Sequence, residues 1–320
     1  MSSVAVIGAG AWGTALAIQA ARAGNAVMLW ARDPVRASII AAGRVNPHLP
    51  GMRLPEPVQV TSAPPESADL VLLATPTQHL RTVLGLLAPE LAPLVVCAKG
   101  VEQTTLRLPL EIVADLRPAA PAAVLTGPNF AHEIAAGLPA AAVVAATEAN
   151  LRESVAAALG TPSFRLYGND DPIGAQVGGA TKNVIAIAAG AVIGAGLGEN
   201  ARAALITRGL AELARLAVAL GGRAETVMGL SGLGDLLLTC TGVASRNYSL
   251  GLALGRGERL DDVLAARSSV TEGVATAPAL VARAQGVDMP ICSAVAALLA
   301  GNLTLAEAIA ALLARPRRDE

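Results

Sequence analysis

Short apolar runs alternate with helix-spaced runs through the first half of the chain. The apolar runs are rich in β-branched residues and have the length of buried strands. Strands are predicted, with helical runs between them, at residues 4–7, 26–30, 58–61, 70–74, 94–98, 123–126, 140–146 and 164–167. This alternation is typical of an α/β fold with a mostly parallel sheet.

The second half of the chain has helical periodicity only. From Gly174 onward we predict helices at residues 174–195, 199–220, 245–255, 271–285, 290–300 and 304–314. One polar loop interrupts them, between residues 231 and 247. A chain of 320 residues is long enough for two domains with separate cores. We therefore predict an α/β domain over residues 1–180 and an all-α domain over residues 181–320.

A glycine-rich turn joins the first strand to the first helix. Gly8-Ala9-Gly10-Ala11-Trp12-Gly13 has the G-x-G-x-x-G spacing in its strand–turn–helix context. Gly8 permits the tight turn, Gly10 lets a pyrophosphate approach the backbone, and Gly13 lets the helix pack closely on the strand. The free N–H groups of the helix N-terminus attract the phosphates. The first domain is therefore predicted to be a Rossmann-type dinucleotide-binding domain.

The pair Arg32-Asp33 follows the second strand and bears on the choice of dinucleotide. An arginine at this position can pair with the 2′-phosphate of NADP(H). Asp33 could instead hold the ribose hydroxyls of NAD(H), or cap the helix that begins at Pro34. We favour NADP(H), with use of NAD(H) as the alternative.

Composition and charge exclude several classes of protein. Net charge is −1, with no basic stripe, so the electrostatic footprint of a nucleic-acid-binding protein is missing. The apolar stretch 184–198 contains four glycines and is shorter than the roughly 20 residues of a membrane span. We predict a soluble cytoplasmic protein without membrane insertion.

Cysteines and histidines indicate neither a disulfide framework nor a metal site. Cys97, Cys240 and Cys292 are odd in number and far apart, as expected of buried thiols in a reducing compartment. The three histidines lack the paired spacing of metal ligands.

Two lysines stand out in a chain that otherwise uses arginine. Lys99 and Lys182 are the only lysines among 24 lysine and arginine residues. Arginine stays protonated at any workable pH, whereas a lysine can act as a base. Lys182 lies near the opening of the first long helical run, where the two halves of the chain meet. We therefore predict that its amine handles a substrate proton, although a surface or capping lysine is the usual alternative.

Further polar residues follow the strand ends and occupy the loop of the second half. Lys99-Gly100 and Gly127-Pro128-Asn129 come directly after strands, and ligands bind at that edge of an open α/β sheet. In the second half, Ser245-Arg246-Asn247 begins a helix, where Arg246 can grip a phosphate with two parallel N–H bonds. Asp235, in a Gly-rich stretch, is as compatible with a turn as with a catalytic group.

The whole chain resembles the bacterial NAD(P)-dependent glycerol-3-phosphate dehydrogenases. The similar motifs lie at residues 8–13, 49–51, 98–100, 127–131, 182–183, 201–209, 229–235, 245–247, 272–273, 289–290 and 313–316. Three positions differ from the commonest pattern of the family. Asn129 stands where serine is frequent, Tyr248 where arginine is frequent, and Ile193 where the residue is usually polar.

The resemblance implies roles for individual residues. Lys182 would accept the substrate proton. Contacts to the substrate or its phosphate would come from Lys99, Gly127, Asn129, Lys182, Asp235, Ser245, Arg246 and Asn247. The dinucleotide would contact Gly8, Gly10, Ala11, Trp12, Gly13, Arg32, Lys99, Ala131, Arg246, Val270 and Glu272. The resemblance also implies a homodimer that supplies glycerol 3-phosphate for phospholipid synthesis.

The mechanism that follows is a hydride transfer at C2 of sn-glycerol 3-phosphate, bound between the two domains. Lys182 takes the proton of the C2 hydroxyl, and returns it to the carbonyl oxygen of dihydroxyacetone phosphate in reverse. A free lysine has a pKa of about 10.4, so burial and the like charge of Lys99 are expected to lower it. Asp235 opposes this shift and is therefore assigned to orienting Lys182 or a substrate hydroxyl.

Two other functions fit parts of the pattern. A β-hydroxyacid dehydrogenase would share the dinucleotide domain, a central lysine and a helical second half, but it would not need the Ser245-Arg246-Asn247 phosphate site. A non-catalytic dinucleotide sensor would leave Lys182 and Arg246 without a role.

Overall fold

The structure, a computed structural model, describes residues 2–91, 93–267 and 270–316. The chain forms two compact units, one of Met1–Lys99 and Arg107–Gln176, the other of Gly100–Leu106 and Val177–Glu320. The predicted boundary after residue 180 falls inside helix α7 (Pro172–Gly194).

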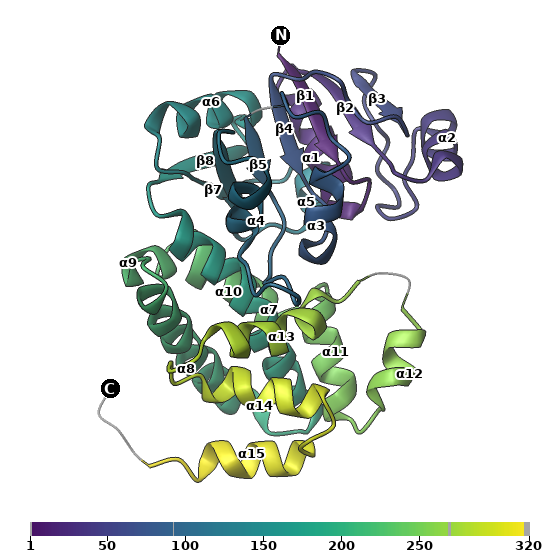
Figure 1. Ribbon diagram of the computed structural model, residues 1–320. Coiled ribbons are helices and arrows are strands. Elements are labelled where there is room, and N and C mark those ends of the chain that lie inside the picture. Colours follow the sequence, from purple (N-terminus) through teal and green to yellow (C-terminus); the bar gives the residue numbers. More distant parts are fainter. Residues whose placement is uncertain (1, 92, 268–269, 317–320) are drawn as a thin grey trace. The chain divides into compact units, whose positions relative to one another are not determined.

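The first unit is built on one sheet with the strand order β3-β2-β1-β4-β5-β6-β7-β8 (Figure 1). All neighbouring strands are parallel except β6 and β7. The strands are β1 (Ser3–Ile7), β2 (Ala26–Trp30), β3 (Val58–Thr61), β4 (Leu70–Leu73), β5 (Leu94–Val96), β6 (Ala122–Thr126), β7 (Ala140–Ala145) and β8 (Phe164–Asn169). The predicted fold class is confirmed for this half.

Alternate strand residues bury their side chains in two separate cores, one on each face of the sheet. Val4 and Val6 of β1 pack with residues of the first helix, whereas Ala5 and Ile7 pack with residues of the third and fourth. This follows from the two-residue period of a strand. The helices of the unit are α1 (Ala11–Arg22), α2 (Pro34–Gly43), α3 (Thr77–Leu84), α4 (Pro109–Leu116), α5 (Ala131–Ala136) and α6 (Ala149–Leu159).

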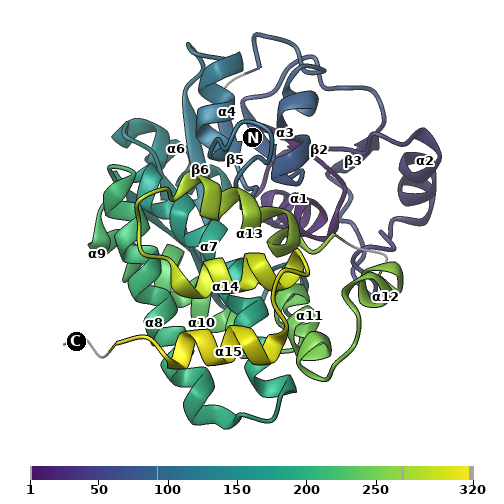
Figure 2. The same cartoon turned by 60° about the horizontal axis from the view of Figure 1, so that its bottom comes forward.

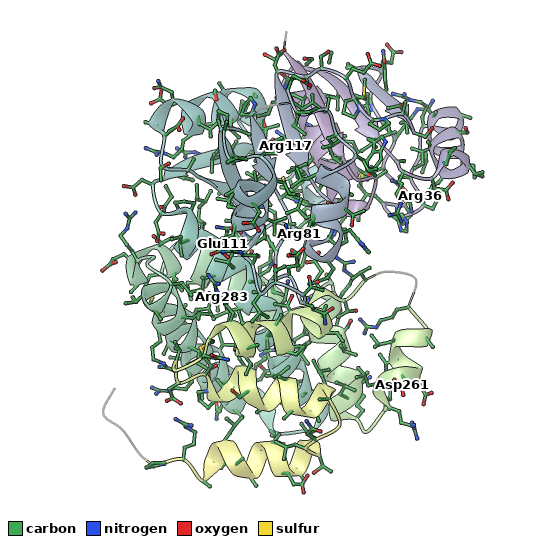
Figure 3. All side chains as sticks on the ribbon, in the orientation of Figure 1. Arg36, Arg81, Glu111, Arg117, Asp261 and Arg283 are labelled. Atoms are coloured by element: carbon green, nitrogen blue, oxygen red, sulfur yellow. The ribbon has the colours of Figure 1, made fainter. Side chains whose placement is uncertain are left out.

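Charged side chains fix the helices α3 and α4 (Figure 3). Glu111 accepts a hydrogen bond from the backbone N–H of Leu108 at 2.7 Å and so caps the beginning of α4. At the other end, Arg117 donates to the carbonyl of Leu84, the last residue of α3, and to that of Leu87 in the loop that follows. The bonds at Leu108 and Leu84 satisfy backbone groups of helix ends.

One predicted helical run is wrong. Residues 62–69, between β3 and β4, form bends and no helix. Pro64 and Pro65 explain the difference, because each proline lacks an N–H donor and disfavours helical backbone in the residue before it.

The second unit is helical in the residues described, as predicted. Its helices are α7, α8 (Gly198–Ala219), α9 (Ala224–Val227), the π-helix η1 (Leu230–Gly234), α10 (Asp235–Cys240), α11 (Arg246–Gly255), α12 (Leu260–Ala265), α13 (Glu272–Arg283), α14 (Pro290–Leu299) and α15 (Leu305–Leu313). The short helices α9, η1, α10 and α12 were not predicted. Much of the expected polar loop therefore consists of the π-helix η1 and the helix α10.

Helix α7 is the central helix of this unit (Figure 1, Figure 2). Among the described helices it alone is long and apolar enough to cross a membrane, but 83% of its most apolar window is buried inside the protein. That burial is typical of a core helix. It begins at Pro172, where Asp171 accepts a hydrogen bond from the N–H of Gly174 at 2.8 Å. Lys182 therefore lies near the middle of the helix, and its predicted place near the opening is wrong.

Glycines bring the backbones of α7 and α11 into direct contact. A Cβ atom at Gly190 would lie 2.0 Å from the carbonyl oxygen of Tyr248, and one at Gly251 would lie 1.9 Å from that of Ile187. Neither position has room for a side chain, so the two helices can approach this closely only with glycine at both. This contact sets the distance between the polar residues that the two helices carry.

Candidate active site

The glycine-rich turn after β1 has the geometry of a dinucleotide site. Gly8 has φ +112°, a conformation that favours glycine, and a Cβ at Gly13 would lie 1.9 Å from the carbonyl oxygen of Gly8. A Cβ at Gly10 would meet no atom within 4 Å, so space is open there. Helix α1 begins at Ala11, and its first N–H groups follow directly after this space.

Asn46 supports the turn and was not predicted. Its buried amide donates to the carbonyl of Ala9 at 3.0 Å and to the hydroxyl of Thr14 at 2.7 Å. These two residues flank the centre of the glycine-rich turn.

The two residues considered for cofactor choice, Arg32 and Asp33, have different environments. Asp33 caps α2, because its Oδ1 accepts hydrogen bonds from the N–H groups of Val35 and Arg36 at 2.9 and 3.3 Å. Arg32 is exposed at the end of the strand. The capping role of Asp33 is thus observed, and Arg32 is available to an anionic ligand.

A second polar group follows β5 and β6 at the same edge of the sheet. Lys99 Nζ donates to the carbonyl of Gly127 at 3.3 Å. Asn129 Nδ2 donates to the carbonyl of Ala141 at 3.2 Å, which fixes the amide orientation, because only an NH₂ group can face a carbonyl. Its Oδ1 is buried and has no hydrogen-bond partner in the described part of the chain.

Helix α5, which begins with Ala131, is held against α1 by an arginine. Arg22, in the last turn of α1, donates to the carbonyls of Ile134 and Ala135 at 2.9 and 2.6 Å. Both helices begin just after the carboxyl end of a strand. Their N-termini therefore face the same edge of the sheet.

In the second unit, Lys182 forms a buried ion pair. Its side chain is 10% exposed, and its Nζ donates to Asp235 Oδ1 at 2.5 Å and to Thr239 Oγ1 at 3.0 Å. The Thr239 hydroxyl donates to the carbonyl of Asp235 at 2.6 Å, so its oxygen faces Lys182 as an acceptor. An anion and an oriented hydroxyl thus fix the amine. No role was predicted for Thr239.

A glycine of α7 lets the π-helix η1 approach it and bring Asp235 to Lys182. A Cβ at Gly178 would lie 2.4 Å from the carbonyl oxygen of Ser231 in η1. A Cβ at Gly232 would lie 1.9 Å from the carbonyl oxygen of Val227, so η1 also packs closely on the end of α9. Short π-helices such as η1 occur often at functional sites. Asp235 follows η1 as the first residue of α10 and is completely buried.

A second polar chain crosses from α7 to α11 and α13. Asn247 Nδ2 donates to Asn183 Oδ1 at 2.9 Å, and its Oδ1 accepts from the N–H of Gly273 at 2.9 Å. Ser245 caps α11 by accepting from the N–H of Tyr248 at 3.2 Å. Asn183, the residue after Lys182, therefore contacts the predicted phosphate-binding turn through Asn247.

Arg246 is exposed in the first turn of α11. Within the described residues its guanidinium makes no hydrogen bond or ion pair, so its charge is available to an anion. Val270 is 52% exposed, and Glu272 begins α13.

Comparison with known proteins identifies the family. A family model described as the NAD-dependent glycerol-3-phosphate dehydrogenase N-terminus matches residues 3–152, and one described as the C-terminus of the same enzyme matches residues 171–310. The chain belongs to the glycerol-3-phosphate dehydrogenase family.

Several relatives match over the whole length. The glycerol-3-phosphate dehydrogenase [NAD(P)+] of Acidiphilium cryptum is 60% identical over 99% of this chain and 98% of its own. That of Gluconobacter oxydans is 54% identical over the same shares. The crystal structure of glycerol-3-phosphate dehydrogenase from Coxiella burnetii has a TM-score of 0.92 and 36% identity, and covers 98% of this chain and 99% of its own.

A more distant likeness concerns the fold alone. A structure of D-mandelate dehydrogenase with NADH has a TM-score of 0.63 at 14% identity, and covers 94% of this chain and 98% of its own. A shared fold does not establish a shared substrate.

The predicted site residues of this family member fall into two groups, one in each unit. Those of the first unit are Gly8, Gly10, Ala11, Trp12, Gly13, Arg32, Lys99, Gly127, Asn129 and Ala131. Those of the second are Lys182, Asp235, Ser245, Arg246, Asn247, Val270 and Glu272. Proximity of Lys99 to Lys182 stays a prediction.

Polar side chains at the strand ends fit a bound dinucleotide. The hydroxyls of Thr75 and Thr126 and the indole N–H of Trp12 are buried, and have no hydrogen-bond partner within the described chain. Buried polar groups are normally paired, so unpaired groups that follow strand ends are expected where a polar ligand supplies the partners. The open space at Gly10 points to the same ligand.

The cysteines are buried and free, as predicted. Burial raises the pKa of the Cys97 and Cys240 thiols to about 12, and Lys99 and Lys182 only partly offset this. Neither thiol is therefore a nucleophile at neutral pH. No group of three histidine, cysteine, aspartate or glutamate side chains within the described ranges could hold a metal ion.

Tyr248 is one of the three departures from the common family pattern. The side chain is buried, and its hydroxyl accepts from Arg202 Nη1 at 3.4 Å. It therefore packs among the helices and leaves the exposed turn to Arg246.

Proposed function

We propose that this chain is an NAD(P)-dependent sn-glycerol-3-phosphate dehydrogenase that interconverts sn-glycerol 3-phosphate and dihydroxyacetone phosphate. The observation that carries the proposal is the buried amine of Lys182, fixed by Asp235 and Thr239 in a chain that also has a dinucleotide-type glycine turn. Family membership narrows the substrate to the glycerol phosphate pair.

Lys182 is the proton donor and acceptor at the C2 oxygen. The negative charge of Asp235 stabilises the ammonium form, which is the form that a ketone reduction requires. As C2 is reduced, negative charge develops on the carbonyl oxygen, and the ammonium stabilises it before donating the proton. The ion pair therefore keeps Lys182 in the acid form that reduction of dihydroxyacetone phosphate to glycerol 3-phosphate, the precursor needed for phospholipid synthesis, uses.

The substrate phosphate is held by the first turn of α11. Arg246 offers two parallel N–H donors, and the helix N-terminus adds its dipole and its free N–H groups. Ser245 and Asn247 complete the turn. Lys99, Gly127 and Asn129 are the substrate residues of the first unit. The buried Oδ1 of Asn129 is a hydrogen-bond acceptor, and so is a phosphate oxygen. It therefore suits a hydroxyl donor of the substrate better than the phosphate.

The dinucleotide binds at the glycine turn. Gly8, Gly10 and Gly13, with Ala11 and Trp12, would hold its pyrophosphate, and bound NADPH or NADH would supply hydride chemistry. The exposed Arg32 would pair with the 2′-phosphate of NADP(H), which favours that cofactor. Further contacts would come from Ala131, Val270 and Glu272.

The deciding experiment is oxidation of NADPH and NADH with three substrates. Dihydroxyacetone phosphate is expected to be reduced, and dihydroxyacetone and a 2-keto acid to be reduced far more slowly, because both lack the phosphate that Arg246 holds. Turnover of the keto acid in place of the phosphate ester would favour a β-hydroxyacid dehydrogenase. Folded protein that binds NADPH but reduces none of the three would favour a dinucleotide sensor.

We also propose a homodimer that acts in the cytoplasm. A mass near twice 32.0 kDa in light scattering after gel filtration would support the dimer, and a mass near 32.0 kDa would contradict it. Fractionation of the source cells tests the location independently.

A further inference from the structure

Arg267 follows α12 and connects two helix beginnings. Its Nη1 donates to the carbonyl of Arg246 at 2.7 Å and to the Thr271 hydroxyl at 3.4 Å. Its Nη2 donates to the Ser249 hydroxyl at 3.0 Å. One half-buried guanidinium thus holds the first turn of α11 and the residue that precedes α13.

A second connection joins the same two helices from within. The N–H of Gly273 donates to Asn247 Oδ1, and Asn247 is buried. The Ser249 hydroxyl also donates to the Arg246 carbonyl at 3.1 Å, beside the bond from Arg267. The backbone of Arg246 is therefore fixed from the α13 side, whereas its side chain is exposed.

The two arginines also place their charges close together. Burial lowers the pKa of Arg267, and the positive charge of Arg246 lowers it further. Two guanidinium groups that repel each other are brought together at a small cost, which a dianion such as a phosphate ester would offset. The donors of Arg267 that bond Arg246, Ser249 and Thr271 are directed at the protein, so Arg267 acts through Arg246.

We propose that Arg267 is a positioning residue for phosphate recognition, which fixes the Arg246 turn against the beginning of α13 and adds a second positive charge to it. The proposal rests on the proposed function, since it concerns the same phosphate. It assigns a role to a residue outside the motifs that the family resemblance covers.

The test uses three variants of the full chain. Arg267→Met removes the charge and the hydrogen bonds, and Arg267→Lys keeps the charge but not the planar fork that reaches three acceptors. Arg259→Met is the matched control, because Arg259 is an exposed arginine (side chain 80% exposed) that precedes the same helix α12. KM and kcat for dihydroxyacetone phosphate are measured at low and high ionic strength, together with Kd for inorganic phosphate.

Arg267→Met is expected to raise KM and the phosphate Kd about 5- to 20-fold, since a charge-assisted hydrogen bond orders the turn. The kcat is expected to change by less than about threefold, because Lys182 is untouched. The KM of Arg267→Lys is expected to lie between those of Arg267→Met and wild type. Because this variant keeps the positive charge, its KM should depend on ionic strength as the KM of wild type does.

Three results would overturn the proposal. The first is a KM and a phosphate Kd for Arg267→Met within twofold of those of Arg259→Met. The second is a loss of kcat and Tm without a change in either constant, which would show a merely structural role. The third is complete rescue by lysine at both ionic strengths. Phosphate binding does not need turnover, so failure of wild type to reduce dihydroxyacetone phosphate would count against the proposed function alone.

Discussion

At the scale of the residue, the chemistry depends on how single polar groups are paired. Lys182 is held by one carboxylate and one hydroxyl, both buried. An amine in this position has a fixed direction and a stabilised charge. Removing one partner of a buried ion pair leaves the other uncompensated and costs about 3–5 kcal/mol. Tests of Lys182 therefore need a substitution that keeps the charge.

Lys182→Arg meets that need. The guanidinium can still pair with Asp235 but does not release its proton, because arginine stays protonated. We expect kcat to fall about 10²- to 10⁴-fold, the usual contribution of a general acid or base, while NADPH binding measured by fluorescence is retained. A kcat near that of wild type would show that another group carries the proton.

Arg246→Ala tests the phosphate contact itself. The variant is expected to raise KM for dihydroxyacetone phosphate about 10- to 100-fold, as expected for loss of hydrogen bonds to a charged group. Because the Arg246 side chain is exposed and its guanidinium makes no hydrogen bond within the described residues, while its backbone carbonyl is kept by alanine, Tm should stay close to that of wild type. Unchanged kinetics would place the phosphate elsewhere.

At the scale of the element, pairs of helices set the positions of these residues. The close contact of α7 and α11 at Gly190 and Gly251 brings Asn183 to Asn247, and the π-helix η1 brings Asp235 to Lys182. Neither contact is visible in the helical periodicity of one element, because both depend on the backbone of another element. Helix geometry, and not side-chain chemistry, thus decides the spacing of the site.

Gly251→Ala tests the helix crossing. The added methyl group would meet the carbonyl oxygen of Ile187 at 1.9 Å, so the helices must separate, at a cost of about 1–3 kcal/mol or more. We expect a lower Tm and a higher KM for the phosphate ester, since Asn247 lies one turn away. Gly242→Ala is the control, because a Cβ there meets no atom within 4 Å. Equal Tm values for the two variants would contradict this account.

At the scale of the whole molecule, a buried carboxylate makes folding sensitive to pH. Glu212 of α8 accepts from the N–H groups of Ile291 and Cys292 at 2.6 and 3.1 Å, which fixes the beginning of α14. Burial raises the pKa of the Glu212 carboxyl above its usual value, against the opposing effect of these two bonds. The folded protein therefore binds this proton more tightly than the unfolded chain.

The sign of the pH effect follows from that shift. The contribution of Glu212 to stability is fully present below the unfolded pKa of about 4.5 and is lost as pH rises through the higher folded pKa. Glu212→Gln does not titrate and leaves one buried N–H without an acceptor, a loss of about 1–3 kcal/mol. Its Tm deficit relative to wild type should therefore be largest near pH 5 and shrink toward pH 8.

The exposed Glu225→Gln, on the neighbouring helix α9, is the control for this series. Its Tm should follow that of wild type at each pH. A Tm deficit of Glu212→Gln that stays constant, or grows with pH, would show that burial does not control this carboxyl.

Elements that depend on local pattern could be predicted from the amino-acid sequence alone. The strands β1 and β2, the glycine turn and the long helices were predicted within a few residues, because apolar periodicity and glycine act on neighbouring residues. The sequence also indicated that Lys182 was unusual, since lysine is so rare in this chain. Residues 62–69 were predicted to be helical from the alternation of strands and helices, but Pro64 and Pro65 prevent a helix there.

Which residues meet depends on the tertiary structure. Thr239 and Asn46 had no predicted role, and Arg267 carried no signal at all, whereas Asp235 was assigned to Lys182 or a substrate hydroxyl only after the family resemblance. Each acquires its role through partners distant in sequence; Lys182 and Asp235, for example, are 53 positions apart. Spacing along a chain fixes neighbours within an element, whereas contacts between elements depend on how closely their backbones can approach, and here glycine sets that distance.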